Sequence, residues 1–157
     1  MRLKQYTVKK DLTLGTPYLS ELSEVKLPAA KRCMYTCEDV VSLLIEYYGV
    51  NELVEEECFL VCVDINLKAI GVCIVSHGSI NATIVSPREV YQRALLIGAT
   101  GIFVVHNHPS GRAVPSAEDR IVTEKLQSAG EAIGIQLIDH VIIGDYFYSF
   151  HKEGLLK

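Results

Sequence analysis

The sequence has 157 residues, of which 49% are hydrophobic and 22% are charged, so it can bury a substantial core within one compact domain. Its formal net charge of −4 argues against a general nucleic-acid surface, because phosphate binding depends on basic patches. It has no run of about eighteen apolar residues, and its basic first residues lack the apolar segment of a signal peptide. We therefore expect a cytoplasmic protein with no membrane span.

The first part of the chain, residues 1–35, shows no sustained periodicity and is interrupted by glycine and proline. We therefore predict an extended N-terminal arm with one short strand near residues 6–8. Such an arm could wrap around the domain or join two copies, so a homodimer remains one interpretation.

The next predicted elements are a helix and two antiparallel strands. Thr36 is a plausible N-cap for a helix whose apolar stripe ends at Gly49. Residues 58–63 form a continuous apolar run, which is typical of a strand buried on both faces, and residues 69–76 are its predicted antiparallel partner. His77 follows in a loop, where it could contact a substrate.

The second half of the chain alternates between helical and strand patterns. A helix begins with Pro87 at its first position and ends at Gly98. The remaining predicted elements are a buried strand at 101–105, a helix at 117–133 and strands at 135–143 and 146–150. This alternation predicts an α/β fold, a three-layer sandwich in which helices flank a central mixed β-sheet.

The strongest functional signal follows the strand at 101–105. His106 and His108 are two positions apart at a strand end, so their side chains project to the same side. The loop of ten residues that follows is long enough to bring Asp119 back to them. Two imidazoles and one carboxylate suit zinc and leave a fourth position for water, which is typical of a catalytic zinc site. Ser116-x-x-Asp119 also fits a helix capping box, and one aspartate can serve both purposes.

The whole pattern, H-x-H-P-x-G-x3-P-S-x2-D, resembles the signature of the JAMM (MPN+) metalloproteases. Two flanking stretches resemble the bacterial RadC-like branch of that family. They are Pro87-Arg88-Glu89-Val90 and Leu137-Ile138-Asp139-His140-Val141-Ile142-Ile143-Gly144. The resemblance extends from about Thr36 to Leu156. It implies that an N-terminal arm (1–35) precedes a RadC-like JAB/MPN metalloprotease domain (36–157).

The resemblance implies a JAB/MPN fold, which is related to that of the cytidine deaminases. It also implies that zinc is bound by His106, His108 and Asp119, and that Ser116 hydrogen-bonds either the zinc-bound water or the developing oxyanion. Outside this set, we expect His140 to be a hydrogen-bonded structural histidine.

The resemblance further implies a catalytic glutamate at the entrance to an early strand. The local pattern Glu-x-Phe before an apolar strand selects Glu57 as this general base. Glu56 remains the alternative, since strand alternation sends neighbouring side chains to opposite faces. A non-catalytic interpretation is that Glu55, Glu56 and Glu57 form a solvent-exposed acidic end of the strand.

The leading functional hypothesis is a zinc metallopeptidase of the JAMM type, which cleaves amide or isopeptide bonds in a peptide or protein with zinc-activated water. One alternative is a DNA-repair accessory or nuclease of the RadC-like type. The acidic net charge weakens this alternative, and residues 1–35 are too few to hold the helix-hairpin-helix region that RadC-like proteins commonly carry. The other alternative is a non-catalytic module that binds a peptide against its sheet.

Overall fold

The computed structural model describes residues 2–78 and 85–156, which hold three α-helices and seven strands. The strands are β1 (Arg2–Lys10), β2 (Pro17–Lys26), β3 (Glu57–Val63), β4 (Ala69–His77), β5 (Gly101–Asn107), β6 (Gln136–Ile143) and β7 (Phe147–Ser149). The helices are α1 (Cys37–Tyr48), α2 (Pro87–Ile97) and α3 (Ala117–Ile133). The described strands form one sheet in the order β2-β1-β4-β3-β5-β6-β7, in which the β1–β4 and β5–β6 pairs are parallel and the others are antiparallel.

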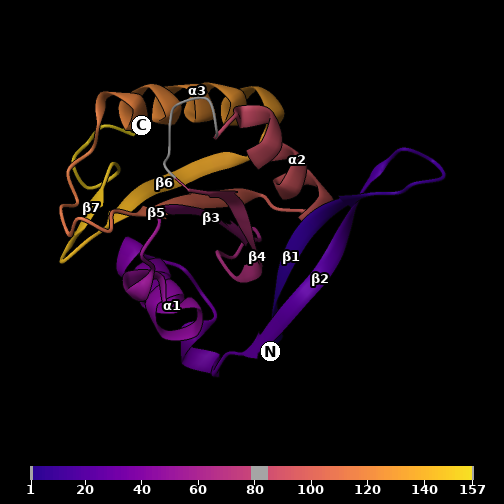
Figure 1. Cartoon of the computed structure of the whole chain (residues 1–157), viewed down its shortest axis with the longest axis horizontal. Coiled ribbons are helices and arrows are strands. Elements are labelled where there is room, and N and C mark those ends of the chain that lie inside the picture. The colour runs from indigo at the N-terminus through magenta and orange to yellow at the C-terminus, as the bar shows by residue number, and fades with distance from the viewer. Residues whose placement is uncertain (1, 79–84, 157) are drawn as a thin grey trace.

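Helices cover both faces of this sheet (Figure 1). We call the face under α2 and α3 the α3 face, and the opposite face the α1 face. Alternation along β3 supplies both cores, because Cys58 and Leu60 pack on the α3 face whereas Phe59 and Val61 pack on the α1 face. The predicted three-layer α/β sandwich with a mixed sheet is therefore confirmed.

The helices begin and end at the residues that sequence patterns predicted. The Thr36 hydroxyl accepts a hydrogen bond from the Asp39 backbone N–H, and the Asp39 side chain completes a capping box at the start of α1. Each helix ends at a glycine in the left-handed region, namely Gly49, Gly98 and Gly134. None of the helices within the described ranges combines the length and the apolar content needed to cross a membrane.

The N-terminal segment differs from its prediction. Instead of one short strand at residues 6–8, it forms a hairpin of two long strands, and β1 joins the sheet through parallel pairing with β4. The far end of the hairpin projects from the body of the molecule (Figure 1). The prediction of a single strand is wrong because most of the hairpin is only half-buried or exposed, so it carries no alternating apolar pattern.

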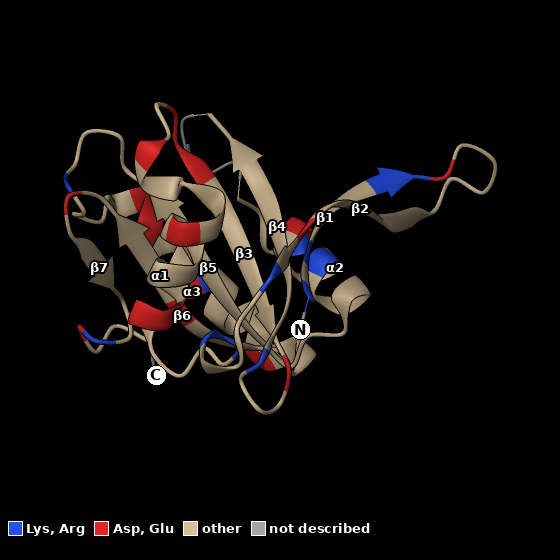
Figure 2. Ribbon diagram, turned by 90° about the horizontal axis from the view of Figure 1, so that it is seen from below, with Lys and Arg blue, Asp and Glu red and all other residues tan. Residues whose placement is uncertain are grey.

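Charge is distributed unevenly between the hairpin and α1. The basic residues of β1 are Arg2, Lys4, Lys9 and Lys10, and this strand has no acidic residue. Helix α1 carries Glu38, Asp39 and Glu46 and has no lysine or arginine. In Figure 2, blue marks the basic residues along β1 and red marks the acidic residues of α1.

Candidate metal centre

Three predicted ligands come together where β5 ends and α3 begins. His106 lies on the α3 face of β5, directly opposite Cys58 of β3. His108 follows the last residue of β5, and its backbone N–H donates to the carbonyl oxygen of Ile143 at 2.7 Å. Asp119 lies in the first turn of α3, so a strand end, a loop and a helix start each contribute one side chain.

The donor atoms of these three side chains are close neighbours. His106 Nε2 lies 3.1 Å from His108 Nε2 and 3.4 Å from Asp119 Oδ1. One candidate ligand atom from each residue lies within 4.8 Å of the other two. His106 and Asp119 are buried and His108 is half-buried. The cluster could therefore hold a metal ion with access from one side.

The hydrogen bond made by the other ring nitrogen of His108 fixes its tautomer. His108 Nδ1 lies 2.7 Å from the carbonyl oxygen of Arg112. A carbonyl oxygen only accepts hydrogen bonds, so Nδ1 must carry the proton. In the neutral ring Nε2 is then a bare lone pair that faces the cluster.

A chain of buried hydrogen bonds fixes the tautomer of His106 in the same way. The Thr123 hydroxyl donates to the backbone oxygen of Asp119 at 2.6 Å, so it must accept from His140 Nδ1, also at 2.6 Å. His140 Nε2 is then bare, and it accepts from His106 Nδ1 at 3.1 Å. His106 Nε2 is left as a lone pair toward the cluster. His140 is therefore a hydrogen-bonded histidine, as predicted, and one that orients a candidate ligand.

Burial keeps both of these rings neutral. Burial, with the neighbouring His140 as the next cause, lowers the pKa of His106 well below its usual value. Burial also lowers the pKa of His140 to about 4. Burial opposes the charge of Asp119, but the proximity of His106 and the hydrogen bonds from Ser116 hold the pKa of this carboxyl below its usual range. The neutral ring of His106 thus faces the charged carboxylate of Asp119.

Ser116 caps α3 and orients Asp119. Its backbone N–H and its hydroxyl both donate to Asp119 Oδ2, at 2.7 and 2.6 Å, and the Asp119 N–H donates back to the hydroxyl at 3.1 Å. This is the predicted capping box, and it uses only one carboxylate oxygen. The other oxygen, Oδ1, faces His106, so the cap and the ligand role are compatible.

The loop between His108 and Asp119 is held against the turn between β6 and β7. Gly111 has a φ of +79°, and a Cβ atom there would lie 2.7 Å from a carboxylate oxygen of Asp145. A Cβ atom on Gly144 would overlap the carbonyl oxygen of Gly111, which accepts from the Asp145 N–H at 2.8 Å. Both positions therefore require glycine.

The two candidate bases lie at the same edge of the sheet as the cluster. Glu57 is the first residue of β3 and is buried, whereas Glu56 precedes the strand and is half-buried. The Glu57 N–H donates to Asn107 Oδ1 at 2.8 Å, and Asn107 Nδ2 donates to the carbonyl oxygen of Glu55 at 3.0 Å. The amide of Asn107, between the two histidines, thus ties the start of β3 to the end of β5.

Sequence reasoning predicted a structural role for Asn107, between the two histidines, but missed its partners and missed Thr123. Thr123 had a detectable signal, because it lies four positions after Asp119 and can bond back to that carbonyl along the helix. The contact of Asn107 with β3 had no local signal, since its partners lie about 50 residues earlier in the chain.

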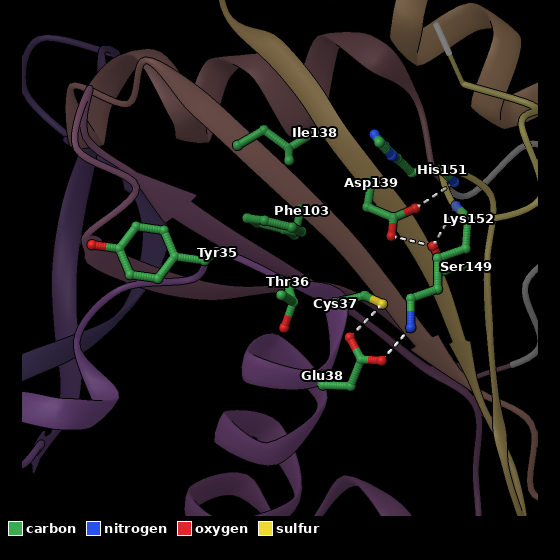
Figure 3. Close-up of a pocket in the computed structure, with 10 residues that line it drawn as sticks. All are labelled: Tyr35, Thr36, Cys37, Glu38, Phe103, Ile138, Asp139, Ser149, His151 and Lys152. Atoms are coloured by element: carbon green, nitrogen blue, oxygen red, sulfur yellow. Dashed lines mark hydrogen bonds and ion pairs between the residues drawn. The ribbon is translucent and has the colours of Figure 1, made fainter.

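A separate pocket of about 540 Å³ opens on the α1 face (Figure 3). Asp139 of β6 points into this region, where it accepts hydrogen bonds from the Ser149 hydroxyl and from the His151 N–H. Glu38 pairs with Lys152 at the same pocket. Burial raises the pKa of Asp139 above its ordinary value. The other lining residues are Tyr35, Thr36, Cys37, Phe103 and Ile138.

Comparison with known proteins identifies the family. The model of the RadC-like JAB domain matches residues 34–155. A UPF0758 protein of Thermotoga maritima is 36% identical over 157 residues, which cover 98% of this chain and 66% of that protein. A UPF0758 protein of Methanosarcina barkeri is 37% identical over 140 residues, which cover 88% of this chain and 60% of that protein. The chain thus spans 60% to 66% of the length of these relatives. It belongs to the RadC-like JAB domain family.

Proposed function

We propose that this chain is a zinc-dependent hydrolase that cleaves amide or isopeptide bonds in a peptide or protein. One observation carries the proposal, namely that His108 Nε2 and Asp119 Oδ1 converge on His106 Nε2, at 3.1 and 3.4 Å. Facing acceptors repel one another in a buried site, and a bound cation converts this repulsion into attraction.

The donor set fits zinc. In a tetrahedral site with Zn–N and Zn–O bonds of about 2.0–2.2 Å, neighbouring donor atoms lie roughly 3.3–3.5 Å apart. The separations of 3.1 and 3.4 Å in this structure are close to that range. Three protein donors also leave the fourth position that a catalytic site keeps for water or substrate.

A zinc ion held by three protein groups supplies Lewis acidity, which polarises a carbonyl and makes water a usable nucleophile near neutral pH. Glu57 is proposed to take the proton from the attacking water and to pass it to the leaving nitrogen as the C–N bond breaks. Glu57 is preferred to Glu56 because it is the more buried of the two and immediately precedes Cys58, which pairs with His106.

Ser116 has two proposed roles. It orients Asp119 through two hydrogen bonds to Oδ2, and its hydroxyl, 2.6 Å from that oxygen, is proposed to donate to the developing oxyanion. The second role requires the hydroxyl to turn away from Asp119, whose Oδ2 then keeps the Ser116 N–H as its donor.

Zinc content tests the first part of the proposal. We expect one zinc ion per chain in the purified protein and none in His106→Ala, because that variant removes a donor. His151→Ala is the matched control, since His151 lies outside the cluster and is expected to keep its zinc. A parent protein that takes up no zinc, even when zinc is supplied, would refute the proposal.

Peptide cleavage tests the second part. A peptide library is expected to be cleaved by the zinc-loaded protein, and Glu57→Gln is expected to lower the rate by about 10²–10⁴-fold, the usual contribution of a general base. Glu56→Gln is the matched control. If Glu56→Gln shows the larger loss, the base has been assigned to the wrong residue.

A further inference from the structure

We propose that His77 is a positioning residue for Glu57, holding its carboxylate in the orientation that general-base catalysis needs. This inference rests on the proposed function of Glu57. It also concerns the specific contact between these two side chains, which can be tested without a substrate.

His77 and Glu57 are directly opposite each other on neighbouring strands. The pairing of β3 with β4 places them at the end of the ladder, and His77 Nδ1 lies 2.7 Å from Glu57 Oε1. The second ring nitrogen, Nε2, lies 2.9 Å from Glu55 Oε2. The imidazole is therefore held from both ends, which fixes the plane of the ring against Glu57.

Glu57 lies behind this ring. The side chain of Glu57 is 10% exposed, whereas that of His77 is 64% exposed. Within residues 2–78 and 85–156, no lysine or arginine nitrogen lies within 4.0 Å of the Glu57 carboxylate. His77 is thus the basic side chain that contacts Glu57 in the described part of the chain.

The backbone around both residues is already fixed. The Glu57 N–H donates to Asn107 Oδ1, and the Gly78 N–H donates to the carbonyl oxygen of Glu56 at 2.9 Å. These bonds tie the start of β3 to β5 on one side and to the end of β4 on the other. The freedom that remains to Glu57 lies in its side-chain torsions, and the contact with His77 restricts these torsions.

Such a restriction matters for a base because proton transfer depends on geometry. A general base must lie within about 2.6–3.2 Å of the proton donor, directly or through one water. His77 occupies one oxygen of Glu57, Oε1, and leaves Oε2 to accept the proton. The exposed ring does not need to touch the substrate to have this effect.

Three variants test the inference. His77→Ala removes the contact, His77→Gln keeps a side-chain N–H that can donate to Glu57, and Glu55→Gln changes only the far side of the ring. Crystal structures are expected to show the Glu57 carboxylate displaced in His77→Ala, restored in His77→Gln and unmoved in Glu55→Gln. Zinc content is expected to stay at the parent level in all three.

Kinetics on a cleaved peptide provide the second measurement. We expect kcat to fall by about 10–100-fold in His77→Ala with KM unchanged, in the range seen when partners of functional residues are lost. His77→Gln is expected to recover most of this loss, and Glu55→Gln is expected to match the parent. Recovery by glutamine separates positioning from a general loss of folding.

Two results would overturn the inference, namely a Glu57 carboxylate that keeps its place in His77→Ala, or a kcat that does not change when the carboxylate moves. Failure of the proposed function looks different. In that case the parent cleaves nothing, or Glu57→Gln is as active as the parent, while the crystal structures still show whether His77 positions Glu57.

Discussion

The two faces of the central sheet handle their buried polar groups in opposite ways. On the α3 face, His140, Thr123 and His106 form one hydrogen-bonded chain that leaves lone pairs unused at its end. On the α1 face, the carboxylate of Asp139 is satisfied by Ser149 and His151, beside a pocket of about 540 Å³. A sizeable pocket thus lies on the side where the polar groups already have partners. For metal chemistry, unused lone pairs are a better guide than cavity size.

The faces meet at neighbouring residues of β6. Asp139 faces α1 and the next residue, His140, faces α3, where the Phe150 ring stacks on it at 5.0 Å. The Asp139 carboxylate in turn accepts a hydrogen bond from the backbone N–H of His151, the residue that follows Phe150. One carboxylate on the α1 face therefore holds the turn whose Phe150 packs on the α3 face, against His140.

The largest expected difference between the faces is in metal binding by matched aspartate variants. Asp119→Asn is expected to lower zinc affinity by more than about 100-fold, because it replaces a charged carboxylate ligand with a neutral amide. Loss of a supporting partner costs only about 10–100-fold. Asp139→Asn is expected to bind zinc as the parent does. Competition with a chelator measures both, and equal losses would show that the two faces are not separate.

A smaller loss is expected from the chain that supports His106. His140→Phe keeps an aromatic ring against Phe150 but removes the acceptor for His106 Nδ1. We expect zinc affinity to fall by about 10–100-fold. His151→Phe is the control on the α1 face. An unchanged affinity in His140→Phe would mean that the His106 tautomer is set by another group.

Removal of the Asp139 carboxylate on the α1 face is expected to lower the stability of the fold. Asp139→Ala leaves the Ser149 hydroxyl and the His151 N–H without their acceptor, so the free energy of unfolding is expected to fall by about 1–3 kcal/mol. Denaturant unfolding of the zinc-free protein measures this loss apart from metal binding. A loss of zinc affinity as large as that in Asp119→Asn would contradict the division between the faces.

Asp139 and Glu38, which both line the α1-face pocket, are expected to have opposite effects on the pH dependence of stability. Burial raises the pKa of Asp139 above 3.8, so its contribution is present below that pH and is lost as the pH rises through the folded pKa. The Lys152 hydrogen bond lowers the pKa of Glu38 from 4.5 to about 2, so its contribution is present above 4.5 and is lost as the pH falls toward 2. The free energy of unfolding is measured against pH for Asp139→Asn and Glu38→Gln. Asp139→Asn is expected to lose a decrease in stability with rising pH, and Glu38→Gln an increase. Slopes of the same sign would show that one assignment is wrong.

The smallest expected effect is that of Lys152→Ala. Its ion pair with Glu38 is exposed to solvent, and exposed pairs contribute little. The melting temperature is expected to change by about 2 °C or less and to become less sensitive to salt. A larger change would mean that Lys152 also closes the α1-face pocket.

Local residue chemistry made much of the fold predictable. Threonine, proline and serine at helix starts and glycine at helix ends placed all three helices, and apolar runs placed β3 and β5. The candidate ligands were predictable because one short stretch contains them. The contact between His77 and Glu57 was not, since it depends on the register between β3 and β4. That register shifts after Cys58 pairs with Ser76, and no local pattern indicates such a shift.

The contact between Gly111 and Gly144 limits how far the candidate metal-binding stretch can be transplanted. A designer who grafts residues 106–119 onto another scaffold carries the three donors but leaves the second glycine behind. The new scaffold must then supply a glycine that lies in van der Waals contact with Gly111. It must also supply a backbone N–H that donates to the carbonyl oxygen of Gly111. The portable unit is therefore the loop together with the β6–β7 turn, two pieces of chain that a linear motif does not join.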